Sequence, residues 1–243
     1  MSVASGMKPS QLGGPSFRSA PARLAVSTRW RLPISCSTSS TPETFVRIYW
    51  DLDNIKPPAK LKACTNDIVR ALKETVAEAA SEGLGRQIAA GTVELHGHCN
   101  CHTIQQLSKE LKHALLTQEG NSLSTAIPDR KEVVDQDIIA SMLRFAGEHR
   151  SDACVGLISS DQGFAKALRY CRSLDCHTVV ACKGRPYSGK ACSMKWGRQP
   201  LQAAADAALS WDALLDAVRD GESPTAALLQ EHDAEPESAA GMG

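Results

Sequence analysis

Apolar residues follow two different spacings along the chain, and the two spacings alternate. Short runs rich in β-branched and aromatic residues predict β-strands, whereas apolar residues that recur every three or four positions predict amphipathic helices. The predicted strands are 45–50, 92–96, 125–127, 153–158 and 177–181. The predicted helices are 65–81, 103–116, 131–148 and 162–173.

The run at 153–158 is almost entirely apolar, which is typical of a strand buried on both faces of a parallel sheet. Strands that alternate with helices of ten or more residues imply right-handed crossover connections. We therefore expect an α/β fold, with one central parallel sheet that helices cover on both faces. The predicted domain spans residues 45–218.

The two ends of the chain differ in composition from this domain. Residues 1–42 contain no Asp or Glu, carry five basic residues and are rich in Ser and Pro, which predicts an organelle transit peptide. The Ser content and a plastid-like processing site at 34–37 favour the chloroplast stroma, with the mitochondrial matrix as the alternative. An ordinary disordered N-terminus is the simpler interpretation. The acidic segment 221–243 is predicted to be disordered.

The balance of charge limits how the protein can bind nucleic acid. The chain has 27 basic and 27 acidic residues. Five of the basic residues lie in 1–42 and five of the acidic residues lie in 221–243, so the domain between them has no basic excess. Contact with RNA must then come from a local patch. The segment 183–198 has five basic and two aromatic residues and no acidic one, a combination that suits single-stranded RNA. These residues are Lys183, Arg185, Tyr187, Lys190, Lys195, Trp196 and Arg198. A solvated loop with its two rings packed on the core is the alternative.

Three carboxylates are expected at one edge of the sheet. Asp51 follows the first strand, Asp161 follows the strand 153–158, and Asp135 lies in the first turns of the third predicted helix. Ligands of open parallel sheets bind at the carboxyl ends of the strands, so these side chains should converge there. Crowded carboxylates repel each other, and Mg²⁺ or Mn²⁺ would offset that repulsion and supply a water that attacks phosphorus. Singly, each Asp could instead serve only as a helix cap.

Four segments, in order along the chain, resemble the NYN domain family. They are Val46 to Asn54 (VRIYWDLDN), Lys131 to Asp135 (KEVVD), Leu157 to Phe164 (LISSDQGF) and Ala208 to Trp211 (ALSW). The chain is most similar to NYN proteins of the meiosis-regulator and limkain type. The resemblance implies a PIN-like (Rossmannoid) fold and a divalent-metal-dependent ribonuclease that hydrolyses single-stranded RNA in organellar RNA metabolism and gene regulation.

The resemblance also implies roles for individual residues. Asp51, Asp135 and Asp161 would be the catalytic metal ligands. Supporting positions would be Asp53, Asn54, Ser159 and Lys131. Two positions depart from the family pattern, because Ser141 and Gly163 stand where many members have further acidic residues. A domain that binds RNA or a protein partner without cleaving it is therefore a second hypothesis.

Two other interpretations belong to different classes of chemistry. Asp51 and Asp53 have the spacing of the Asp-nucleophile phosphatases, with Ser159 or Ser160 as the strand-end hydroxyl. The segment 96–102 is rich in His and Cys, but its spacing matches none of the usual zinc sites.

Nine Cys, an odd number scattered through predicted strands and helices, indicate a reducing compartment rather than a disulfide framework. No apolar run approaches the roughly 20 residues that a membrane span needs. The sequence does not indicate an oligomeric state.

Overall fold

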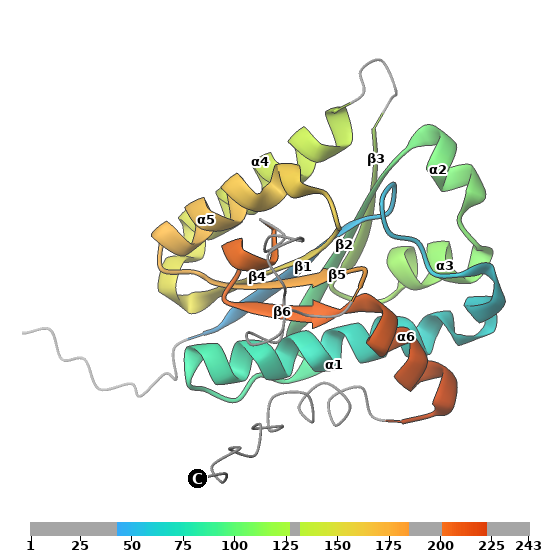
Figure 1. Cartoon of the computed structure of the whole chain (residues 1–243), viewed down its shortest axis with the longest axis horizontal. Helices are drawn as coiled ribbons and strands as arrows, with labels where there is room; N and C mark the ends of the chain where they lie inside the picture. Colours follow the sequence, from blue (N-terminus) through green and yellow to red (C-terminus); the bar gives the residue numbers. More distant parts are fainter. Residues whose placement is uncertain (1–42, 127–131, 185–200, 223–243) are drawn as a thin grey trace, which may run out of the picture. The chain divides into compact units, whose positions relative to one another are not determined.

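The computed structural model describes residues 43–126, 132–184 and 201–222, which form a six-stranded parallel sheet with helices on both faces (Figure 1). The strand order is β3-β2-β1-β4-β5-β6. The strands are β1 (Phe45–Asp51), β2 (Val93–Asn100), β3 (Asn121–Ala126), β4 (Ala153–Ile158), β5 (His177–Cys182) and β6 (Ala207–Ser210). The predicted α/β class and parallel sheet are confirmed, while the predicted transit peptide and residues 223–243 of the predicted acidic tail lie outside the described residues.

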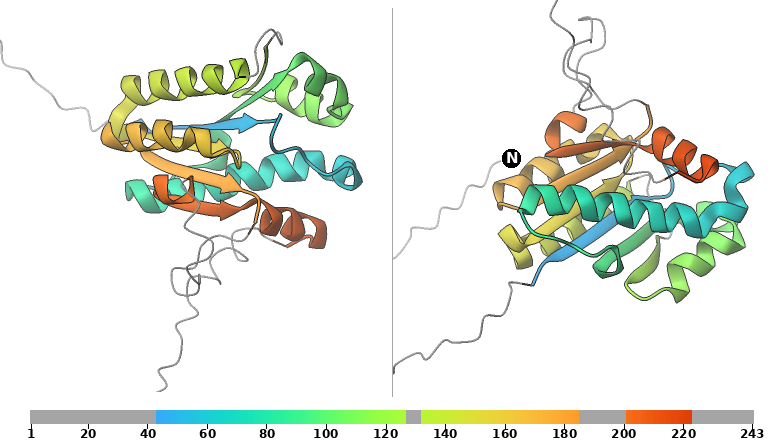
Figure 2. Two further views of the ribbon diagram at one scale, coloured as in Figure 1. Left: turned by 45° about the horizontal axis from the view of Figure 1, so that its top comes forward. Right: turned by 90° about the horizontal axis from the view of Figure 1, so that it is seen from below.

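Six α-helices are described, and most of them cover one of the two faces of the sheet. They are α1 (Thr65–Leu84), α2 (Cys101–Gln106), α3 (Lys109–Thr117), α4 (Val133–His149), α5 (Ala165–Ser173) and α6 (Trp211–Asp220). One face packs against α1, α3 and α6, and the other packs against α4 and α5. Figure 2 shows the sheet between these two helical layers.

Alternation along the strands explains this double core. In β1, the side chains of Ile48 and Trp50 enter the core beneath α1, whereas Tyr49 enters the core beneath α4. All six residues of β4 are buried, as expected for a central strand of a parallel sheet. The same alternation turns Asp51 to the face that carries α4, because Asp51 lies two residues beyond Tyr49.

The predicted helix 103–116 is wrong as a single element. The chain breaks at Leu107 and Ser108, and the two halves are separate helices. Asn100 caps α2 by accepting hydrogen bonds from two backbone N–H groups, and Ser108 caps α3 through the N–H of Leu111. Apolar residues recur with helical spacing across the break, so periodicity alone did not reveal it.

The order of the strands places a possible ligand site between β1 and β4. The chain runs outward from β1 through β2 to β3, and then returns across the sheet to β4. At such a reversal, the loops after two neighbouring strands diverge and leave a crevice at their carboxyl ends. Asp51 ends β1 and Asp161 follows β4, so both lie at this reversal. None of the helices in the described ranges is long and apolar enough to cross a membrane.

Candidate functional site

Asp51 is the buried centre of the candidate site. Its side chain lies at the end of β1 and the residue is 2% exposed. One carboxylate oxygen accepts a hydrogen bond from the Ser159 hydroxyl at 2.8 Å, and the other accepts from the backbone N–H of Asn54 at 3.2 Å. Burial raises the pKa of Asp51, and the hydrogen bond from Ser159 opposes that rise. The carboxylate is therefore fixed in direction but poorly solvated.

Ser159 links Asp51 to Asp161. Its hydroxyl donates to Asp51 and accepts from the backbone N–H of Asp161 at 3.1 Å. The loops after β1 and β4 are joined a second time, since the Asn54 side-chain oxygen accepts from the N–H of Ser160 at 3.1 Å. Through these contacts Ser159 and Asn54 hold the two loops together.

Asp53 contacts the end of β2. Its carboxylate accepts hydrogen bonds from the backbone N–H of Asn100 and from the Asn100 side-chain amide at 3.0 Å. Asp53 therefore fastens the loop after β1 to the end of β2. The supporting role expected of Asp53 stays a prediction.

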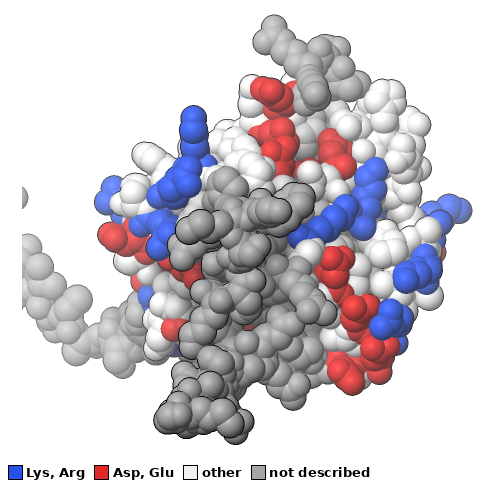
Figure 3. Space-filling model, in the orientation of Figure 1, with Lys and Arg blue, Asp and Glu red and all other residues white. Residues whose placement is uncertain are grey.

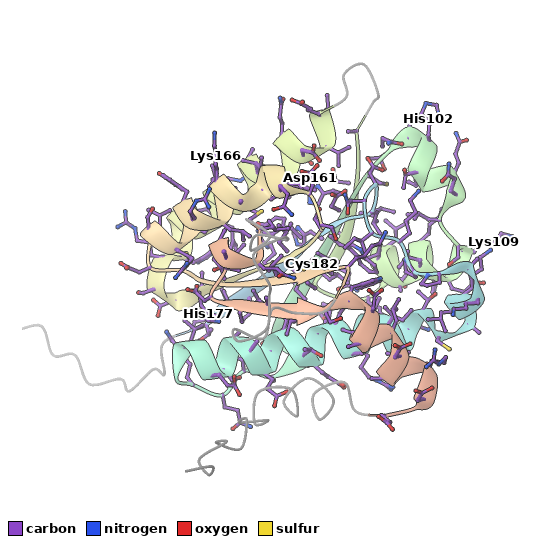
Figure 4. All side chains as sticks on the ribbon, viewed as in Figure 1. His102, Lys109, Asp161, Lys166, His177 and Cys182 are labelled. Atoms are coloured by element: carbon purple, nitrogen blue, oxygen red, sulfur yellow. The ribbon has the colours of Figure 1, made fainter. Side chains whose placement is uncertain are left out.

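Asp161 is exposed and lies four residues before the start of α5 (Figure 4). One carboxylate oxygen accepts from the N–H of Gly163 at 2.7 Å, which caps the short 3₁₀ turn Gln162–Phe164. The capping role that the sequence allowed for Asp161 is therefore real. A cap uses one oxygen of the carboxylate, so the second oxygen stays available to a ligand.

The electrostatics of Asp135 show that the three carboxylates share one region. The pKa of Asp135 is raised to about 6, first by burial and then by the negative charges of Asp51 and Asp161. Asp53 and Glu132 add smaller effects of the same sign. Figure 3 shows acidic side chains gathered where α4 begins. Asp135 therefore lies near enough to Asp51 and Asp161 for their charges to act on it.

The described residues hold no group of three His, Cys, Asp or Glu side chains that is spaced to surround one metal ion. The predicted three-ligand set therefore stays a prediction. Mg²⁺ usually takes only one or two protein carboxylates and keeps several waters. The oxygen donors and the mutual repulsion of Asp51, Asp135 and Asp161 fit such a cation, with Asp51 fixed and Asp161 accessible.

Of the predicted RNA-binding residues, only Lys183 lies within the described part of the chain. Its ammonium group donates to the backbone oxygen of Asn54 at 3.2 Å, and its N–H donates to the Ser160 hydroxyl at 3.0 Å. Lys183 therefore places a positive charge beside the carboxylate edge. Lys131, Arg185, Tyr187, Lys190, Lys195, Trp196 and Arg198 lie outside the described residues.

Sequence reasoning missed a buried histidine next to the site. His98 pairs with Asp51 across the β1–β2 register and is 4% exposed. Its Nδ1 lies 2.9 Å from the carboxylate of Asp137, which also accepts from the Ser124 hydroxyl at 3.3 Å. Burial lowers the pKa of His98, and Asp137 opposes that effect. The i, i+2 spacing of Asp135 and Asp137 was the available signal, since it sends the two carboxylates to different sides of α4.

The segment 96–102 has a structural explanation. Its residues end β2 and begin α2, and the Asn100 side chain caps that helix. Alternate strand residues point to opposite faces, so His98 faces α4 while Cys99 is buried in the core beneath α1.

Comparison with known proteins identifies the class. The family model of the NYN domain matches residues 45–212, and the chain therefore belongs to the NYN domain family. A Vibrio parahaemolyticus crystal structure, of a protein described as of unknown function, is 14% identical over 72% of this chain and 97% of that chain, with a TM-score of 0.44. No curated protein matches.

Proposed function

We propose that this protein is a divalent-metal-dependent ribonuclease that hydrolyses phosphodiester bonds of single-stranded RNA. The observation that supports this most strongly is the electrostatic coupling of Asp135 to Asp51 and Asp161 at the strand-order reversal. Membership of the NYN family suggests a PIN-like nuclease and adds independent support.

The arrangement of the residues suggests how the work is divided. Mg²⁺ or Mn²⁺ would supply a nucleophilic water near neutral pH and would stabilise charge on the phosphate. Asp51 would hold the ion from the buried side, because Ser159 and Asn54 fix both of its oxygens. Asp135 and Asp161 would complete the negative pocket from α4 and from the loop after β4. Lys183 would attract the RNA backbone from the exposed side.

A second candidate function is RNA binding without cleavage. Ser141 and Gly163 stand where the family resemblance leads us to expect further carboxylates. The backbone oxygen of Ser141 accepts a hydrogen bond from the Tyr49 hydroxyl. The number of metal ions would then be one or none. The Asp-nucleophile phosphatase is less well supported, since the family match points to the nuclease class.

The decisive experiment compares cleavage of an unstructured RNA by the wild type and by Asp51→Asn, with Mn²⁺ and with EDTA. We expect cleavage only by the wild type with Mn²⁺. Asp175→Asn is the matched control, because Asp175 is exposed, precedes β5 at the opposite end of the sheet and has a φ of 64° that Asn tolerates. Equal cleavage by Asp51→Asn would exclude this site.

We further propose that the protein acts in the chloroplast stroma, with the mitochondrial matrix as the alternative, and that its function resembles that of limkain-type NYN proteins. The acid-free composition of residues 1–42 supports import. N-terminal sequencing of the protein from its native cells should begin near Ser37. An intact Met1 terminus on a cytosolic protein would contradict the proposed location.

A further inference from the structure

The exposed face of α5 combines positive charge with an aromatic ring. Lys166, Arg169, Tyr170 and Arg172 are exposed, and the helix contains no acidic residue. Tyr170 is 53% exposed, which is unusual for a ring on a helix that otherwise packs through Leu168 and Cys171. The domain as a whole has no basic excess, so this concentration of charge is local.

The helix begins at the candidate active site. Asp161 caps the 3₁₀ turn that leads directly into α5, and Figure 4 shows Asp161 close to this end with Lys166 further along. Lys166 and Arg169 lie three residues apart, and Tyr170 lies four residues beyond Lys166. Residues at these spacings share one helix face, so the two cations and then the ring follow one another away from Asp161.

Two of these cations are free to bind an external ligand. Arg172 forms an ion pair with Asp206 at 2.7 Å. By contrast, within the described part of the chain, neither Lys166 nor Arg169 forms an ion pair or a side-chain hydrogen bond. Figure 3 shows Lys and Arg side chains gathered over the region where Figure 1 draws α4 and α5.

We propose that this face of α5 binds the single-stranded RNA that enters or leaves the carboxylate edge, with Lys166 and Arg169 on its phosphates and Tyr170 stacked on an unpaired base. The proposal rests on the proposed function for the nature of the ligand. Negative phosphates complement the two free cations, and the exposed ring suits an unpaired base, since a duplex hides the faces of its bases.

Fluorescence anisotropy with a labelled oligouridylate tests this binding directly, in EDTA so that no cleavage occurs. In Lys166→Gln/Arg169→Gln, the slope of log affinity against log salt should fall by about 1.4, because each phosphate contact on a single strand contributes about 0.7. Tyr170→Ala should weaken binding by about fivefold to a hundredfold with an unchanged slope, and Tyr170→Phe should bind as the wild type does.

The controls come from α3, which packs on the other face of the sheet. Lys109→Gln removes an exposed cation and Leu116→Ala removes a side chain that is 63% exposed, so neither should change affinity or salt slope. Circular dichroism establishes that each variant is folded. The proposal would be overturned if Lys166→Gln/Arg169→Gln kept the wild-type salt slope and Tyr170→Ala kept the wild-type affinity. Equal binding of duplex RNA, or a change in oligomeric state caused by Tyr170→Ala, would also overturn it.

The same variants separate this proposal from the proposed function. If the wild type cleaves no RNA but the Lys166→Gln/Arg169→Gln and Tyr170→Ala variants bind RNA more weakly, the α5 binding surface is supported and the ribonuclease function is contradicted. Metal-dependent cleavage together with unchanged binding by the α5 variants supports the ribonuclease and contradicts the α5 surface.

Discussion

Asp135 carries an unfavourable charge in the metal-free protein. Its pKa of about 6 lies above the ordinary value of 3.8, so the folded state holds this proton more tightly than the unfolded state does. The stability of the folded state then falls as pH rises from about 4 to about 6. Asp135→Asn should therefore raise the free energy of unfolding by about 1 kcal/mol at pH 7, a figure reduced for solvent screening because Asp135 is only partly buried.

Urea denaturation in EDTA at pH 7 and pH 4 measures this effect. Most of the difference between Asp135→Asn and the wild type should disappear at pH 4, because the carboxyl is then protonated in the folded state and close to half protonated in the unfolded state. Burial lowers the pKa of His96 to about 4, so His96 changes stability with the opposite sign. It stabilises the folded state above about pH 6.5, and this stabilisation is lost as the pH falls. His96 is present in both proteins, so its contribution cancels in the difference. A variant less stable than the wild type at pH 7 would refute the repulsion.

Gly163 is the position where one added carboxylate should raise activity. A Cβ atom at Gly163 would lie 3.2 Å from the Asp161 carboxylate oxygen, so the new side chain would begin beside the candidate ligand. Gly163→Asp should raise Mn²⁺-dependent RNA cleavage, or reveal it if the wild type shows none. Gly163→Ala adds the same Cβ without charge and is the control. Equal cleavage rates for the two variants would show that a second carboxylate is not what the site lacks.

At the residue scale, the sequence predicts the strand-end carboxylates but not their partners. Asp51 and Asp161 follow from where strands end, since parallel strands share one carboxyl edge. The His98–Asp137 pair does not follow, because it depends on how far β2 extends. The sequence predicts a strand that stops at His96, whereas β2 continues to Asn100.

Helix α4 is tied to the sheet near its first turn by Asp137. This carboxylate accepts from Ser124 on β3 and pairs with His98 on β2, whose side chain is 5% exposed. Asp137→Ala should lower the free energy of unfolding by about 1 to 2 kcal/mol, because it leaves a buried imidazole without its partner. Gln136→Ala, at an exposed position beside it, should change stability by less than about 0.5 kcal/mol. Chemical denaturation of both variants checks this, and similar losses would argue against the tie.

At the scale of elements, long periodic segments are predicted better than short ones. The helices at 65–81 and 131–148 and the strand at 153–158 are confirmed with small shifts of their ends. Strand β6 has four residues and was not predicted as a strand, because a run so short carries little periodicity. The position of α2 and α3 depends on the local capping by Asn100 and Ser108.

At the scale of the whole molecule, the strand order decides where the chemistry lies. A reversal between β1 and β4 brings together Asp51, Asp135 and Asp161, which the linear sequence separates. The sequence predicts the parallel sheet and this shared edge from alternation alone. It does not predict which strands are neighbours at the reversal, because that depends on the packing of helices on two faces.

Calorimetric titration of the metal-free protein with Mn²⁺ tests whether the three carboxylates bind a cation. The wild type should bind Mn²⁺ with a measurable heat at millimolar ion, and Asp51→Asn, Asp135→Asn and Asp161→Asn should each bind it more weakly, because each removes a carboxylate from the same edge. Asp175→Asn, at the opposite end of the sheet, should bind as the wild type does. No heat of binding in the folded wild type, or equal affinity in all four variants, would contradict the account.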